Sequence, residues 1–135
     1  MLRAAWTELI DENFEKLAAA GFGDLRPSHR LIIREMFVSN LRPSELAARL
    51  GLSKQAVNDL VREFEAMGYI TLEPDPDDRR AKRIVATDRG WRTVQVSLKS
   101  SNATSRRWAK QDGEARYAVF EEVLREIVTA QDLSR

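Results

Sequence analysis

Apolar residues in the first half of the chain recur at every third or fourth position, which is the spacing of one face of an amphipathic helix. Four helices are predicted in this way, over residues 2–20, 27–37, 43–50 and 53–67. Glycine follows the first, third and fourth of them, and proline begins the second and third. Both placements are favourable, because glycine adopts the left-handed backbone past a helix end and the first helical turn does not need the N–H that proline lacks.

The pattern then changes from helical to alternating. Residues 69–73 and 83–87 are typical of short strands, and the segment between them, 74–82, is rich in proline, aspartate and arginine. A hairpin with a long charged tip is therefore predicted. Two further helices follow, one capped by Thr87 and one at the end of the chain. We interpret the polar stretch 100–105 as exposed or bent helix.

The length of 135 residues is that of about one domain, whose core needs neither a disulfide nor a metal to stay folded. The chain contains no cysteine, and its single histidine, His29, cannot build a multi-histidine metal site. No metal or other cofactor is therefore expected. No apolar run approaches the roughly 18–20 residues of a membrane span. A soluble, cytoplasmic protein without a membrane partner is expected.

The charges are nearly balanced in number but unevenly distributed. The 22 basic and 21 acidic residues give a formal net charge of +1, which by itself does not indicate a protein that coats nucleic acid. Residues 1–24 and 112–135 each carry an excess of acidic residues, whereas 89–110 contain six basic residues and no acidic one. Positive charge is thus concentrated in the middle of the chain.

The third and fourth predicted helices have the spacing of a helix-turn-helix. Ala47 is small enough for a second helix to cross closely above it, and Gly51 permits the left-handed backbone of a tight turn. Val57 can pack the second helix onto the first. No charged residue stands at any of these three positions, so we expect the two helices to pack against each other there.

At roughly 100° per residue, the fourth helix has one apolar and one polar half. The polar half carries Lys54, Gln55, Asn58, Asp59 and Arg62. Amide side chains can bind an adenine edge through two hydrogen bonds, and lysine and arginine can bind guanine or phosphate, so this face suits the major groove of DNA. A solvated surface face is the alternative, and the packing residues of the helix-turn-helix favour DNA recognition.

The hairpin supports the same interpretation independently. It carries Arg79, Arg80, Lys82 and Arg83 at and just after its tip, and it directly follows the fourth helix, where a wing would lie beside the duplex. We expect Arg80 to enter the minor groove and Asp78 to hold the Arg80 side chain in place. A solvated charged loop is the alternative.

Several segments resemble the winged helix of the MarR (multiple antibiotic resistance regulator) family of transcription factors. They are Ser44-Glu-Leu-Ala-Ala-Arg-Leu-Gly-Leu-Ser, the stretch 57–70, the hairpin motif Asp75-Pro-Asp-Asp-Arg-Arg-Ala and the closing Thr87-Asp-Arg-Gly. The hairpin motif is the most specific of them, because a helix-turn-helix in general does not require it. The sequence departs from the family pattern at Arg42, where serine or threonine commonly caps the third helix, and at Ala86, which replaces a larger apolar residue.

The resemblance implies a mainly α fold with a small β-hairpin wing. In a single domain of 1–135, a winged helix-turn-helix of residues 25–90 is flanked by dimerisation helices, 1–24 and 91–135. It also implies a homodimeric regulator of transcription, usually a repressor, that binds double-stranded DNA and is often released by a small aromatic ligand. The residues expected to contact DNA are Ser44, Ser53, Lys54, Gln55, Asn58, Arg62, Asp78, Arg79, Arg80 and Lys82.

Dimerisation is expected through the first and last helices, which are both amphipathic. A twofold-related copy can interleave with their apolar residues, and two recognition helices then lie about 34 Å apart, one turn of duplex, on a pseudo-palindromic operator. The alternative is that these residues pack against each other within one subunit. The expected interface residues are Leu2, Trp6, Ile10, Tyr117, Phe120, Leu124 and Ile127.

A ligand pocket near the second and fifth helices is implied by the resemblance alone, with His29, Trp6 and Trp91 as candidate lining residues. His29 is predicted on the apolar side of its helix, where most histidines are structural and bonded to backbone or carboxylate. The two tryptophans are likewise more often core or interface residues than pocket walls.

Two other classes of function are less well supported. A winged helix can dock a protein partner through the same helix face, and the salt dependence of binding separates that class from DNA recognition. An enzyme is not expected, and no catalytic residue is assigned. The chain offers no nucleophile–histidine pair, glycine-rich phosphate loop or paired carboxylates in an apolar setting.

Overall fold

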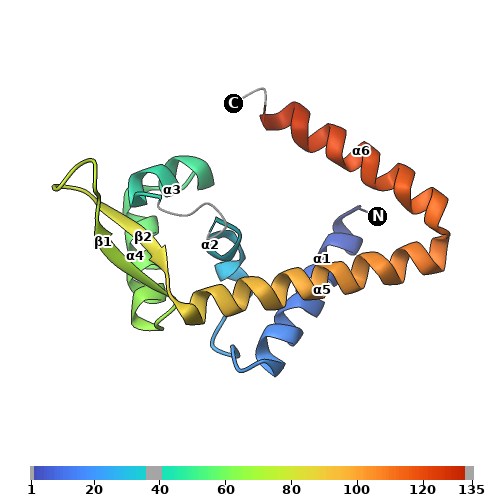
Figure 1. Cartoon of the computed structure of the whole chain (residues 1–135), viewed down its shortest axis with the longest axis horizontal. Helices are drawn as coiled ribbons and strands as arrows, with labels where there is room; N and C mark the ends of the chain where they lie inside the picture. Colours follow the sequence, from blue (N-terminus) through green and yellow to red (C-terminus); the bar gives the residue numbers. More distant parts are fainter. Residues whose placement is uncertain (1, 36–40, 133–135) are drawn as a thin grey trace. The chain divides into compact units, whose positions relative to one another are not determined.

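The computed structural model of the chain describes residues 2–35 and 41–132 (Figure 1). The chain divides into two compact units, Met1–Leu98 and Lys99–Arg135. The elements in chain order are α1 Leu2–Ala19, the 3-10 helix η1 Pro27–His29, α2 Arg30–Glu35, α3 Pro43–Leu50, α4 Lys54–Ala66, β1 Ile70–Pro74, β2 Lys82–Ala86, α5 Asp88–Asp112 and α6 Glu114–Asp132.

The turn between α3 and α4 is tight, and local hydrogen bonds hold it. Gly51 has the left-handed φ of +63° that ends α3. The amide of Leu52 donates to the carbonyl of Ala47 at 3.1 Å. Ser53 begins α4 by accepting a hydrogen bond from the amide of Ala56 at 3.1 Å. The predicted helix-turn-helix is therefore present, with its glycine and its capping serine at the predicted positions.

The hydrophobic core of the first unit lies between its helices and the start of the hairpin. Val57, Val61 and Phe64 of α4 are buried in it together with Ala47 of α3. The other core residues are Leu17, Phe22, Leu25, Ile32, Ile33, Leu46, Tyr69, Ile70 and Val94. Because this cluster removes the apolar half of α4 from water, the polar half of that helix is the one left at the surface.

The hairpin is an antiparallel pair in which β1 and β2 match over all five residues of each strand. The amide of Asp75 donates to the carbonyl of Ala81 at 3.0 Å and closes the loop between them. The amide of Ile84 in β2 donates to the carbonyl of Leu41 at 2.8 Å, which attaches the hairpin to the chain just before α3. The loop projects beyond α3 and α4 (Figure 1).

The second unit contains the last part of α5 and the whole of α6, with Gly113 between them at a φ of +91°. Among its described residues only Ser100 and Thr104 are buried. The large apolar side chains of α6 are instead exposed. We call this set the α6 apolar row; it consists of Val119, Phe120, Val123, Leu124, Ile127 and Val128.

The predicted fold class, mainly α with a small β-hairpin wing, is confirmed. The second predicted helix begins with a 3-10 turn, η1, and continues as α2; its predicted residues Met36 and Phe37 lie outside the described ones. Each strand is shifted by one residue from its predicted position. None of the helices described is long and apolar enough to cross a membrane.

The stretch 100–105, interpreted as exposed or bent helix, is α-helical as part of α5. It is exposed only in part, because Asn102 and Ala103 are exposed whereas Ser100 and Thr104 are buried. Such residues fit inside a helix because their hydroxyls can bond to a carbonyl one turn back, as Thr104 does to the carbonyl of Ser100 at 3.2 Å.

Candidate nucleic-acid interface

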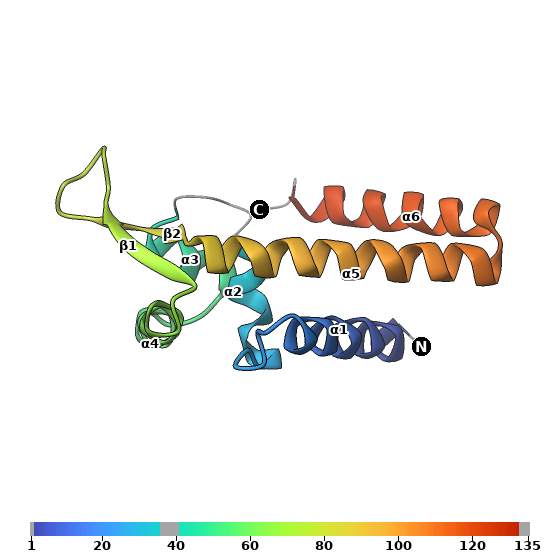
Figure 2. The same ribbon diagram turned by 60° about the horizontal axis from the view of Figure 1, so that its bottom comes forward.

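Helix α4 has one side in the core and one side in solvent. Val57, Val61 and Phe64 are at most 2% exposed. The polar residues on the other side are all exposed, and we call them the outward face of α4: Lys54, Gln55, Asn58, Asp59 and Arg62. Figure 2 looks nearly along the axis of α4 and shows one side of the helix turned away from the rest of its unit. The sequence pattern therefore predicted correctly which half of this helix is buried.

The acidic residue on the outward face, Asp59, is not isolated. Gln55 Nε2 donates to Asp59 Oδ1 at 3.1 Å and to Oδ2 at 3.4 Å. Arg62 Nη1 lies 4.0 Å from Asp59 Oδ1. The spacing of four and then three residues places the three side chains next to one another along the helix. The negative charge of Asp59 therefore has both a hydrogen-bond donor and a cation beside it.

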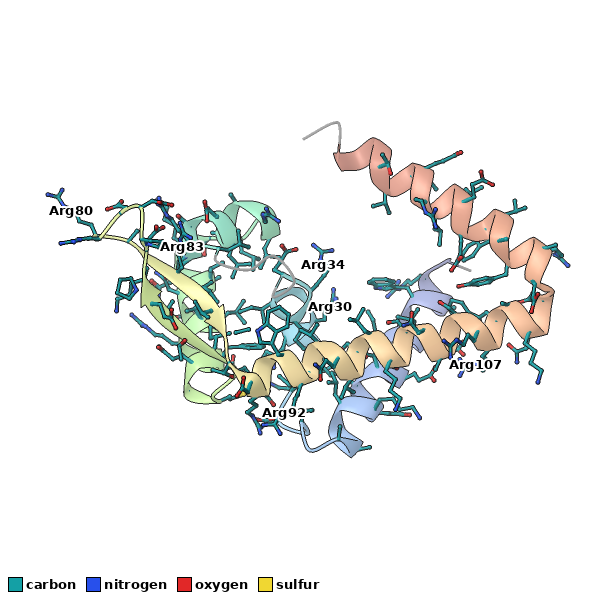
Figure 3. The ribbon with its side chains drawn as sticks, in the orientation of Figure 1. Arg30, Arg34, Arg80, Arg83, Arg92 and Arg107 are labelled. Atoms are coloured by element: carbon teal, nitrogen blue, oxygen red, sulfur yellow. The ribbon has the colours of Figure 1, made fainter. Side chains whose placement is uncertain are left out.

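The wing tip, which we define as residues 78–80, is ordered through its backbone. Asp78 Oδ1 accepts a hydrogen bond from the amide of Arg80 at 3.0 Å, and the amide of Ala81 donates to the carbonyl of Asp78 at 2.9 Å. The expected contact between Asp78 and the Arg80 side chain is thus replaced by one to the Arg80 backbone, the short-range bond that aspartate forms in turns. Figure 3 shows the Arg80 side chain at the outer end of the loop, pointing away from it. Arg79, Arg80 and Lys82 are all exposed.

The wing root, which we define as Arg42, Asp75 and Arg83, is a cluster of charged groups that bond to one another. The side chain of Asp75 is fully buried. Its Oδ2 lies 2.6 Å from Arg42 Nε and its Oδ1 lies 2.9 Å from Arg83 Nη2. The same Arg83 nitrogen lies 2.7 Å from Asp77 Oδ2. Because Arg42 precedes α3 and Arg83 belongs to β2, Asp75 ties the hairpin to the helix-turn-helix.

The electrostatics of the wing root favour the charged forms of all its members. The hydrogen bond from Arg83, followed by those from Arg42 and from the amide of Asp77, holds the pKa of Asp75 well below its usual range despite burial. In return, the hydrogen bond to Asp75 raises the pKa of both arginines. The Asp75 carboxylate is therefore ionised in the folded protein at any pH near neutrality.

Sequence reasoning did not find the role of the wing root. It grouped Arg83 with the other basic residues of the hairpin, whereas the structure turns Arg83 inward, and Figure 3 shows it beside the strands rather than at the tip. One signal was present. Arg42 stands where the family pattern has a capping serine or threonine, and its amide is capped instead by Glu45 Oε2 at 2.7 Å. The arginine side chain is thereby left to reach Asp75.

A second polar cluster fixes the start of the hairpin to α5. Arg89 Nη2 donates to Asp24 Oδ2 and to the Tyr69 hydroxyl, both at 3.1 Å, and its guanidinium lies 4.6 Å from the centroid of the Tyr69 ring. The Tyr69 hydroxyl donates to Asp24 Oδ1 at 2.5 Å. Burial, together with this bond to Asp24, raises the pKa of Tyr69 to about 12.

The winged helix is similar to known proteins. Residues 24–81 match the MarR family. A transcriptional regulator from Thermotoga maritima is 27% identical, with a TM-score of 0.70 over 99% of this chain and 94% of that chain. Over its winged helix the chain is therefore similar to the MarR family. This match confirms the resemblance seen in the segments around the helix-turn-helix and the hairpin.

Two further structures share the MarR fold at lower identity. FabT from Streptococcus pneumoniae, solved in complex with DNA, is 17% identical, with a TM-score of 0.81 over 99% of this chain and 94% of that chain. A MarR family protein from Bacillus stearothermophilus is 19% identical, with a TM-score of 0.78 over 99% and 91% of the two chains. No curated protein matches the sequence. At these identities the likeness shows the fold alone.

Of the three candidate pocket residues, only His29 is buried. Its Nδ1 accepts a hydrogen bond from the amide of Arg26 at 3.0 Å, and its ring packs edge-on against Phe64 of α4, with centroids 4.9 Å apart. Trp6 and Trp91 are 57% and 41% exposed. These contacts are those of a structural histidine, and the ligand pocket stays a prediction.

The predicted dimer residues differ in exposure. Phe120, Leu124 and Ile127 belong to the exposed α6 apolar row, and Trp6 of α1 is also exposed. The remaining described members, Ile10 and Tyr117, are half-buried. The side chain of Leu2 lies outside the described part of the chain.

Proposed function

We propose that the protein is a sequence-specific, double-stranded DNA-binding regulator of transcription that acts as a homodimer on a pseudo-palindromic operator. The observation that carries this proposal is the division of α4 into a buried apolar half and an outward face with amide and basic side chains. A helix of this kind fits the major groove, where base edges are accessible. The DNA complex of the structurally similar FabT supports the same class of partner.

Some residues of the outward face set the affinity for DNA and others set the sequence specificity. Lys54 and Arg62 contact phosphates, whereas Gln55 and Asn58 contact base edges. The first turn of α4 is the positive end of the helix dipole, which further favours phosphate there. Ser53 caps α4 and Ser44 lies in the first turn of α3. Both present their hydroxyl groups to the phosphate backbone of the DNA.

The wing acts on the DNA beside the major-groove site. Arg80 enters the minor groove, where narrow A·T-rich segments concentrate negative potential, while Arg79 and Lys82 contact the flanking phosphates. Asp78 shapes the loop through the Arg80 backbone amide. In this role the wing root is not a contact surface but the attachment that keeps the tip at a fixed distance from α4.

A homodimer is supported by the α6 apolar row, which leaves six large apolar side chains of one helix in water. Contiguous apolar surface of this kind usually marks an interface. Replacement of Ile127 by Asp should convert dimers to monomers in sedimentation experiments, whereas Glu126→Asp on the neighbouring position should not. Sedimentation of the unmodified protein as a monomer at micromolar concentration would remove the homodimer from the proposal.

Repression, and release by a small aromatic ligand, complete the proposed function and rest on the family resemblance. Both are tested by adding aromatic acids to the complex of protein and operator and measuring how much operator stays bound. Transcription by RNA polymerase from a reporter promoter that contains the operator is measured under the same conditions. Reduced binding together with increased transcription supports a ligand-released repressor. Transcription that falls when the protein is removed contradicts repression.

The experiment for the central function is selection of bound duplexes from a random pool, followed by titration at several salt concentrations. We expect one enriched, partly symmetric sequence and an affinity that falls steeply with salt, because each phosphate contact releases counterions. Absence of binding to any duplex at low salt would contradict DNA recognition. It would favour the docking of a protein partner on the outward face of α4.

A further inference from the structure

Asp59 occupies an unfavourable place if the outward face of α4 meets DNA. Its side chain is 60% exposed, and a carboxylate there repels the phosphates that Lys54 and Arg62 attract. A protein with a neutral residue at this position would bind any duplex more tightly. The negative charge therefore calls for a function other than raw affinity, and the neighbours of Asp59 indicate which one.

The closest contact of Asp59 is with a side chain assigned to base recognition. Gln55 Nε2 lies within hydrogen-bond distance of both carboxylate oxygens, at 3.1 Å and 3.4 Å. Arg62 Nη1, at 4.0 Å from Oδ1, supplies positive charge on the other side. Gln55, Asp59 and Arg62 thus form one continuous polar row on the helix surface, with the carboxylate in the middle.

The contact decides which way the Gln55 amide is turned. A glutamine amide has an acceptor at one end and a donor group at the other, and a half-turn of the amide exchanges them. A carboxylate only accepts, so the turned amide would bring Gln55 Oε1 against the Asp59 oxygens and is disfavoured. The amide nitrogen therefore stays on the side of Asp59, and Oε1 stays on the opposite side.

A fixed amide is what recognition of adenine requires. Gln binds adenine by accepting from N6 with its oxygen while donating to N7 with its nitrogen. The NH2 group has two N–H bonds, so one can remain on Asp59 while the other pairs with N7. Resting on the proposed function, we propose that Asp59 is a positioning residue that holds Gln55 in the one orientation able to read an adenine in the major groove.

This role predicts opposite effects of one substitution on affinity and on specificity. Asp59→Ala removes both the charge and the acceptor. Binding to duplexes without the operator should rise by about threefold or more at low salt, because a repelling charge is lost. Discrimination at the single base pair read by Gln55 should fall, because the amide can then turn freely.

Asp59→Asn is a second test. Its side chain is neutral and carries a donor as well as an acceptor, so Gln55 can bond to it in either orientation, and we expect the same effects as in Asp59→Ala. Asp59→Glu is the matched control, because its carboxylate keeps the charge and only accepts, and it should retain both the weak nonspecific binding and the discrimination at the Gln55 position. A purely electrostatic role of Asp59 would leave discrimination at that position unchanged in all three variants.

The experiment is selection of duplexes from a random pool by the full chain and by Gln55→Ala, Asp59→Ala, Asp59→Asn and Asp59→Glu. The position at which Gln55→Ala loses its preference identifies the base pair that Gln55 reads. Dissociation constants are then measured on the selected duplex and on single substitutions at that pair. Thermal melting of each variant verifies that this exposed row does not affect folding.

We expect the unmodified protein and Asp59→Glu to prefer adenine at that position by about tenfold or more, and Asp59→Ala and Asp59→Asn by less than about threefold. Retained discrimination in Asp59→Ala overturns the positioning role. A preference that shifts at a C·G pair in Asp59→Ala and Asp59→Asn also overturns it, since Asp59 would then read a cytosine amine directly. If the unmodified protein selects no duplex at all, the proposed function itself fails and the inference falls with it.

Discussion

The wing root and the wing tip contain the same residue types and yet behave in opposite ways. Asp75 and Asp78 are three positions apart in one acidic-and-basic segment. At the root, Asp75 is buried and bonded to two guanidinium groups. At the tip, Asp78 bonds only to backbone in the contacts described, and Arg80 next to it extends into solvent. At the wing root the charged side chains attach the hairpin to the rest of the chain, whereas at the wing tip they stay available to a partner.

A protruding wing needs a rigid base. A two-stranded hairpin alone is at best marginally stable in water. Here the backbone bond from Ile84 to Leu41 and the ion pairs of Asp75 connect it to the chain before α3. An arginine held at a defined distance from α4 loses less conformational freedom on binding than one on a mobile loop. The root thereby prepares the tip for its partner.

The largest expected effect comes from breaking the root. Asp75→Ala leaves Arg42 and Arg83 without their common partner, and removal of one member of a buried ion pair is strongly destabilising. We expect the melting temperature to fall by on the order of 10 °C. Asp78→Ala, the same change at the tip, should lower it by only a few degrees, since one exposed hydrogen bond is lost. Equal falls in the two variants, measured by circular dichroism, would contradict the distinction.

Substitution of Arg80 at the wing tip and of Arg83 at the wing root should have smaller effects, on DNA affinity and on stability respectively. Arg80→Ala should weaken binding to the selected duplex by on the order of tenfold and reduce the slope of log K against log salt by about one, without a change in melting temperature. Arg83→Ala should lower the melting temperature, because Asp75 and Asp77 lose a shared donor. An Arg80→Ala protein with unchanged affinity at moderate salt would show that the wing tip does not contact DNA.

Acidification of the unmodified protein should remove the stability that Asp75 contributes at the wing root. The folded pKa of Asp75 is depressed below the ordinary value of 3.8, so its contribution to stability is fully present above that pH and is lost as the pH falls towards the folded pKa. The melting-temperature difference between the protein and Asp75→Asn should be constant from about pH 8 to pH 5 and narrow below about pH 4. A constant difference down to pH 2 would mean that Asp75 is not the titrating group.

The smallest effect is spectroscopic and concerns Tyr69, which precedes β1. Its pKa of about 12 means that the neutral phenol is favoured in the folded state, so this stabilisation is present below about pH 10 and is lost as the pH rises through 12. In Tyr117→Phe, where Tyr69 is the remaining tyrosine, ultraviolet absorbance should report ionisation near pH 12. Asp24→Asn should lower that value, since the charged acceptor of the phenol proton is removed.

The helix-turn-helix was predictable because its determinants are local. Ala47, Gly51 and Val57 lie within eleven consecutive residues, and Ser53 caps the helix in which it stands. The hydrophobic period of α4 alone identified its outward face. Secondary structure of this kind depends on neighbours in sequence, so the pattern of residue types contains most of the necessary information.

The wing root was not predictable because it depends on a contact between distant residues. Nothing in the run of three aspartates at 75, 77 and 78 distinguishes the one that becomes buried. That choice is made by Arg42, which is 33 positions away from Asp75. The bond between Gln55 and Asp59 is an intermediate case. Their spacing permits it, but only the side-chain geometry shows that it forms.

Directed cleavage can test whether the outward face of α4 and the wing tip both lie on duplex DNA. The chain has no cysteine, so a single cysteine at Asn58, Arg79 or Gln111 can carry an iron–EDTA reagent that cuts nearby DNA. With the selected duplex, Asn58→Cys should give cuts within the two half-sites, and Arg79→Cys should give cuts displaced to their outer flanks. Gln111→Cys, in the second unit, should give none. Cuts from position 111 together with none from 58 or 79, in proteins that still bind the duplex, would contradict the account.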